Sequence, residues 1–193
     1  MSYLFDAWCR DPRPLLFGEY LDELYRSWDT WTPASPHGQE LAELYRECHR
    51  RIRAGEHFAV CYVGLDAPGT ASPRLIPLLS QLLRRSIEKR HREHNHVAYL
   101  GHGDFMLLVE VGDLVALCSE VCDVFDTKVA AEDEPLPTVS IGVITNQSRN
   151  IVHFAQATEL AIEMKRYADS VPGSVFVVDR RQETAEPPTN VNA

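Results

Sequence analysis

The chain has 193 residues, 45% hydrophobic and 24% charged, which is the composition of a globular domain with its own core. Its net charge of −9 argues against a broad nucleic-acid-binding surface, because phosphate contacts need clustered Lys and Arg. No apolar run approaches the ~20 residues of a membrane helix. Residues 1–14 also lack the pattern of a secretory signal. We therefore expect a cytoplasmic protein with neither nucleic-acid nor membrane partners.

The cysteines favour a reducing environment. There are five of them, and no two form a Cys-x-x-Cys pair. Cys118 and Cys122 share one face of an expected helix, beside the apolar Leu117 and Val121. Buried, reduced thiols are therefore favoured over a zinc site.

Helical patterns dominate residues 1–55. Apolar residues recur at helical spacing over 15–28 and again over 39–54, and a loop with two prolines and a glycine separates the two stretches. Gly55 is suited to end the second helix. We expect residues 1–55 to form an N-terminal helical segment.

From residue 57 the pattern alternates between strands and helices. Strands are predicted at 57–65, 96–101, 104–111, 138–145 and 174–179, and helices at 74–94, 113–130 and 152–169. The first six of these elements follow the split βαβ order of ferredoxin-like folds. The sequence thus predicts an α+β fold over 56–180, with a central, mainly antiparallel five-stranded sheet flanked by helices. Residues 181–193 are predicted to be a disordered tail.

The turn of the expected hairpin carries the most informative motif, Gly101-His102-Gly103-Asp104-Phe105. Here the chain resembles the GGDEF family of diguanylate cyclases, which join two GTP molecules into cyclic di-GMP. The resemblance extends over roughly residues 33 to 181, through GEHFAVCYVGLD, TVSIGVIT and AIEMKRYADSVPGSVFVVDRR. The last of these is similar to a response-regulator-associated branch of the family. The resemblance implies a nucleotide-cyclase palm.

The departures from the family pattern fall on its metal ligands. Family members hold two Mg²⁺ ions with the first acidic residue of the first strand's signature and the third residue of the hairpin motif. The matching positions are Gly64 and Gly103. Because Mg²⁺ needs carboxylate oxygens and glycine has none, the resemblance predicts a protein without cyclase activity, metal or cofactor.

Two acids remain near these positions, Asp66 on the second acid of the strand signature and Asp104 on the fourth hairpin position. An alternative alignment treats His102 as an insertion and moves Asp104 to an earlier motif position. We expect that alignment to require a one-residue slip, which would turn the strand's side chains to the wrong face.

A second family site, Arg-x-x-Asp, binds the product cyclic di-GMP. The matching ends are Arg92 and Asn95, so the charged guanine acceptor is replaced by a neutral amide, at a loss of about 1–3 kcal/mol. Three nearby basic residues add to the candidate ligand site: Arg84, Arg85 and Lys89. The alternative is the solvated polar end of a long helix.

Other candidates are weaker. His91, His94, His96 and His102 are close in sequence, but a helix-to-strand transition scatters their directions and favours solvated side chains over a metal site. Lys165 and Arg166 lie near the family's phosphate-contacting lysine, in an ambiguous register.

Three functions follow in order of preference. The first is an inactive GGDEF-like signalling adaptor that binds a protein partner. The second is a receptor with weak affinity for cyclic di-GMP, and the third is a divergent nucleotide-binding enzyme. Three tryptophans of the N-terminal segment could pair two subunits into a homodimer or dock a partner, or simply pack on the domain itself: Trp8, Trp28 and Trp31.

Overall fold

A computed structural model describes residues 36–66, 74–90, 94–130 and 136–181. The helix predicted at 15–28, the three tryptophans and residues 182–193 of the predicted tail lie outside these residues. Four α-helices are described: α3 (Pro36–Ala54), α4 (Leu75–Glu88), α5 (Leu114–Val129) and α6 (Phe154–Ala168). The five strands are β1 (Ala59–Asp66), β2 (His96–Gly101), β3 (Asp104–Val109), β4 (Thr138–Thr145) and β5 (Val175–Val178).

The strands form one mixed sheet in the order β2-β3-β1-β4-β5. Strands β1 to β4 pair antiparallel, and β5 joins β4 in parallel. The predicted α+β fold with a mainly antiparallel five-stranded sheet is therefore confirmed. Helix α4 ends at Glu88, earlier than residue 94, where the sequence pattern ended it.

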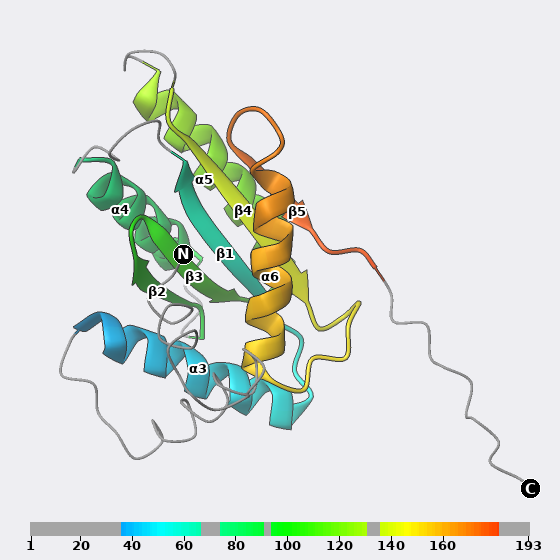
Figure 1. The fold of residues 1–193 in the computed structure, drawn as a ribbon. Coiled ribbons are helices and arrows are strands. Elements are labelled where there is room, and N and C mark those ends of the chain that lie inside the picture. The colour runs from blue at the N-terminus through cyan, green and yellow to red at the C-terminus, as the bar shows by residue number, and fades with distance from the viewer. Residues whose placement is uncertain (1–35, 67–73, 91–93, 131–135, 182–193) are drawn as a thin grey trace, which may run out of the picture.

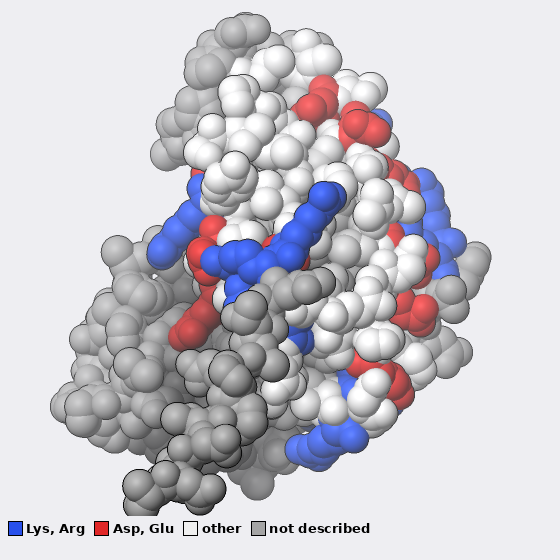
Figure 2. Space-filling view, turned by 90° about the vertical axis from the view of Figure 1, so that its right-hand side faces the viewer, with Lys and Arg blue, Asp and Glu red and all other residues white. Residues whose placement is uncertain are grey.

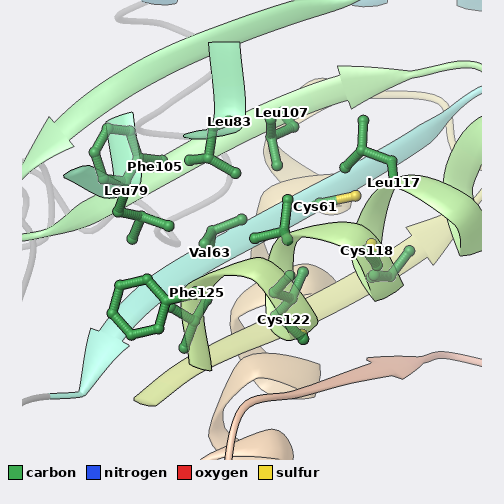
Figure 3. Close-up of a cluster of buried hydrophobic side chains, with 14 of the residues drawn as sticks. Cys61, Val63, Leu79, Leu83, Phe105, Leu107, Leu117, Cys118, Cys122 and Phe125 are labelled. Atoms are coloured by element: carbon green, nitrogen blue, oxygen red, sulfur yellow. The ribbon is translucent and has the colours of Figure 1, made fainter. Parts of the chain in front are cut away.

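The sheet separates two apolar layers (Figure 1). Helices α4 and α5 cover one face, where Cys61, Phe105 and Cys118 are fully buried (Figure 3). Helices α3 and α6 cover the other face, over Tyr62 and Met106. Helix α3 is thus packed on the sheet through its apolar stripe, although the predicted boundary at residue 55 separates it from the strands.

The described cysteines belong to these layers. Cys48, Cys61, Cys118 and Cys122 are buried and free. Burial raises the pKa of Cys48 and of Cys122 to about 12, so both remain protonated thiols at neutral pH. Their predicted role as small core residues is confirmed.

The β2–β3 hairpin contains a bulge at Leu100. Tyr99 pairs with Phe105 and Gly101 pairs with Asp104, so β2 carries one residue more than β3. A bulge absorbs an extra residue without turning the flanking side chains over. The side chains of β2 on either side of Leu100 therefore keep their faces, and the choice between the two alignments of His102 stays a prediction.

No helix among the described residues is long and apolar enough to cross a membrane. On the side shown in Figure 2, groups of Lys and Arg lie beside Asp and Glu on a surface that is otherwise mostly uncharged.

Candidate functional site

The hairpin motif places its third residue in a tight turn. His102 and Gly103 have φ of 54° and 89°, the two positive values that a two-residue hairpin turn requires. A Cβ at Gly103 would lie 3.1 Å from Leu65 Cβ. Position 103 therefore disfavours any side chain, both by its backbone conformation and by this close neighbour.

Asp104, by contrast, faces the first strand. It is the register partner of Gly64, and its Oδ2 accepts a hydrogen bond of 2.9 Å from the Tyr62 hydroxyl. Burial raises the pKa of Asp104 above its ordinary value, and the hydrogen bond from Tyr62 only partly offsets that effect. The residue of β3 that pairs with Gly64 is therefore Asp104, whereas Gly103 lies in the turn.

Lys165 from α6 fills the space above Gly64. A Cβ at residue 64 would overlap Lys165 Cε and lie 2.8 Å from its Nζ. The ammonium contacts Asp169 Oδ1 at 2.8 Å and Asp66 Oδ1 at 3.2 Å. Burial disfavours its charged form, but these two carboxylates outweigh burial and hold the Lys165 pKa above its ordinary value. The site therefore contains a cation supplied by the protein.

This arrangement does not suit Mg²⁺. A magnesium ion requires oxygen ligands at octahedral positions, whereas residue 64 offers no ligand and the Lys165 ammonium lies among the remaining carboxylates. No cluster of three or more His, Cys, Asp or Glu within the described ranges is arranged to hold a metal ion. Asp66 and Asp169 form ion pairs with the Lys165 ammonium, and Asp104 is hydrogen-bonded to Tyr62.

Gly142 explains why Lys165 reaches this position. A Cβ at residue 142 would overlap backbone atoms of Ala161 and Lys165, so only glycine allows α6 to approach β4 this closely. Gly142 pairs with Tyr62 on β1. The close approach therefore brings the Lys165 side chain over β1, which resolves the register of α6 that the sequence left ambiguous.

The candidate ligand residues on α4 point in different directions. Arg84 pairs with Glu40 of α3 at 2.6 Å, whereas Lys89 pairs with Glu120 of α5 at 2.5 Å. For Arg85 no ion pair is recorded within the described residues. Arg92 lies outside the described residues. The basic group is thus divided between α3 and α5.

Asn95 is turned into the protein. Its side chain is 8% exposed, and its Oδ1 accepts a hydrogen bond of 3.0 Å from the backbone N–H of Glu110. The amide joins the start of β2 to the end of β3. Its one acceptor is therefore already engaged by the hairpin.

Comparisons with solved structures agree with this architecture. The active GGEEF domain of a diguanylate cyclase from Vibrio cholerae aligns over 73% of this chain and 94% of its own, with a TM-score of 0.56 and 12% identity. The GGDEF domain of DgcB from Caulobacter crescentus, in complex with c-di-GMP, aligns over 74% of this chain and 89% of its own, with a TM-score of 0.54 and 13% identity. This protein has a GGDEF-like fold.

A third GGDEF-like structure contains a protein ligand. Diguanylate cyclase SiaD from Pseudomonas aeruginosa, in complex with its activator SiaC, aligns over 82% of this chain and 66% of its own, with a TM-score of 0.55 and 17% identity. No protein-family model and no curated protein matches the sequence. At these identities the likeness establishes the fold alone.

Two members of the site, Tyr62 and Asp169, were not predicted from the sequence. Tyr62 lies in an apolar strand, where its ring gave no sign that the hydroxyl meets Asp104. Asp169 follows Lys165 at the i,i+4 spacing of a helical ion pair, and this spacing is the sequence signal that indicates the contact.

Proposed function

We propose that this protein is a catalytically inactive GGDEF-like module that acts in signalling through contact with a protein partner. The observation that carries the proposal is the Lys165 ammonium, which lies above Gly64 among the carboxylates of the site. In this proposal Gly64 and Gly103 are lost metal positions, and the remaining hairpin motif is structural.

Electrostatics supports the loss of metal chemistry. A divalent cation near residue 64 would meet the Lys165 ammonium, and like charges at contact distance repel strongly in a partly buried site. Asp66 and Asp169 already neutralise that ammonium. In phosphoryl transfer, a bound metal ion stabilises the negative charge that develops on the transferred phosphate. In this proposal that stabilisation is absent.

Protein contact is the function that this arrangement leaves open. The core and sheet of the fold are retained, so the domain still presents a defined surface. SiaD, with the same fold, is found in complex with its activator protein. A fold that supports protein contact can act as an adaptor after its chemistry is lost.

Calorimetric titration with GTP, in the presence and absence of Mg²⁺, tests the loss of the metal site. We expect Mg²⁺ to leave any GTP binding unchanged. Saturable GTP binding that requires Mg²⁺ and disappears in Asp104→Ala would contradict the proposal. For the adaptor role, we expect a protein partner that binds the wild type to bind the Arg92→Ala variant as well.

A cyclic di-GMP receptor is the second candidate, because DgcB carries this ligand on the same fold. The engaged Oδ1 of Asn95 weakens the case. We expect no binding, or salt-sensitive binding at roughly tens of micromolar or weaker. Sub-micromolar affinity that is lost in Arg92→Ala would make the receptor the better assignment.

A further inference from the structure

Strand β5 is an edge of the sheet whose outer side is not paired with any strand in the described part of the chain. Its sequence, Val-Phe-Val-Val, contains no charge and no proline. Natural sheets protect an edge with charged residues, proline, a bulge or a very short strand, and of these β5 itself shows only its length of four residues. Figure 1 shows β5 at the margin of the sheet, and Figure 2 looks onto that side of the molecule.

The outward backbone groups of β5 follow from its pairing with β4. The N–H of Asp179 donates to the carbonyl of Val143 at 2.8 Å, so residue 179 points toward β4. Successive residues of a strand point their backbone N–H and C=O groups to opposite sides, so residues two apart point to the same side. The backbone groups of Val177 therefore point toward β4, like those of residue 179. The N–H and C=O groups of Phe176 and Val178 therefore point outward, where a further strand would pair.

The strand is held in place at both ends. Asp179 is 2% exposed and accepts hydrogen bonds from Arg149 and Arg181 just after the strand. At the other end, the Ser174 hydroxyl accepts from the Val139 N–H at 2.9 Å and donates to Asp126. The edge is thus preformed, and a partner strand would not have to order it.

We infer that β5 pairs antiparallel with β5 of a second copy of this chain, which would join two five-stranded sheets into one continuous sheet. Among the registers that the outward groups allow, the one that pairs both outward residues within β5 places Phe176 opposite the second copy's Val178 and Val177 opposite its own equivalent. This pairing is two-fold symmetric, as homodimer interfaces usually are. Four backbone hydrogen bonds form across the junction.

Charge complementarity supports a second copy as the occupant. In this register Ser174 lies opposite the second copy's Arg180, an exposed residue with no ion pair recorded in the described part of the chain. Ser174 contacts Asp126 on α5, the helix that covers the face on which Phe176 and Val178 pack. Ser174 and Arg180 flank β5, and a continued extended geometry would place them on the face of Phe176 and Val178. In this register each Arg180 would therefore approach the Asp126 of the other copy. Two symmetric ion pairs would therefore flank the apolar edge.

Sedimentation analysis of the full chain over a range of concentrations tests this inference, which does not depend on the proposed function. We expect a reversible monomer–dimer equilibrium. In hydrogen exchange, the amides of Phe176 and Val178 should gain protection as concentration rises. A single monomeric species at all concentrations would overturn it. So would protection of these amides that does not depend on concentration, because the edge would then be covered within one copy.

A charge exchange separates this interface from any other dimer. Arg180→Asp and Asp126→Arg should each weaken dimerisation about tenfold, since each loses two ion pairs and gains repulsion. The double variant should return to within about threefold of the wild type. Residues 174 and 180 are roughly 20 Å apart along an extended chain, so rescue within one copy is excluded. Arg46→Asp on α3 is the control and should have no effect; equal dimerisation in all variants would refute the register.

Discussion

Replacing Gly64 with alanine tests whether Lys165 fills the site. The new methyl group would overlap the lysine Cε, so the flexible side chain must withdraw and lose its contacts with Asp66 and Asp169. Both carboxylates are partly exposed, at 38% and 35%, so each ion pair contributes about 0.2–1 kcal/mol. The unfolded chain of the alanine variant is also more restricted, which offsets about 0.5–1 kcal/mol of this loss. We therefore expect Gly64→Ala to lower the free energy of unfolding by at most about 1 kcal/mol, measured by urea denaturation.

The same substitution should have the opposite sign when Lys165 is absent. In a Lys165→Ala background the lysine Cε and Nζ are gone, and the nearest remaining neighbour is Asp104 Oδ1 at 3.2 Å, which must shift slightly. Because alanine restricts the unfolded chain more than glycine does, Gly64→Ala should then stabilise by up to about 0.5–1 kcal/mol. Gly112→Ala serves as the control, because no atom lies within 4 Å of its Cβ position. Equal effects of Gly64→Ala in both backgrounds would refute the placement of Lys165.

Further predictions concern charge and turnover. Because burial raises the pKa of Asp104, its ionised form opposes folding; Asp104→Asn should raise the free energy of unfolding at pH 7, and the difference should vanish below pH 3.8. Hydrogen bonds from Arg50 and Arg51 lower the pKa of Glu47 to about 2, so Glu47→Gln should cost about 2 kcal/mol at pH 7 and progressively less from pH 4.5 down to pH 2. A pH series of denaturation curves checks both. Gly64→Asp with Gly103→Glu should not restore cyclic di-GMP synthesis from GTP, because residue 103 has a φ of 89° that strains glutamate; turnover well above the wild type would show an intact pocket.

Much of the fold was predictable because its strands carry strong local signals. Thr138–Thr145 matches its predicted bounds, since β-branched residues dominate the segment. The bulge at Leu100 was not predictable, because a bulge depends on the partner strand's length as well as on local sequence.

The residue types of the site were visible in the sequence, but their contacts were not. Glycine at 64 can be read from the sequence, whereas the side chain above it depends on how closely α6 approaches β4 at Gly142. Lys165 and Arg166 are adjacent cations, and only tertiary packing selects which one turns inward. The role of Asn95 also depends on tertiary structure, because its residue type does not reveal that its side-chain oxygen accepts a hydrogen bond from the Glu110 N–H.

The most direct test of the central claim is product formation by the purified protein with GTP and Mg²⁺, followed by chromatography against an enzyme-free reaction. The account predicts no cyclic di-GMP above that background, because the Lys165 ammonium lies at the position above Gly64 and no carboxylate is present at residue 64. Steady product formation that is abolished by Asp104→Ala would contradict it. That result would show that Asp104 acts as a metal ligand and that Lys165 moves aside during turnover.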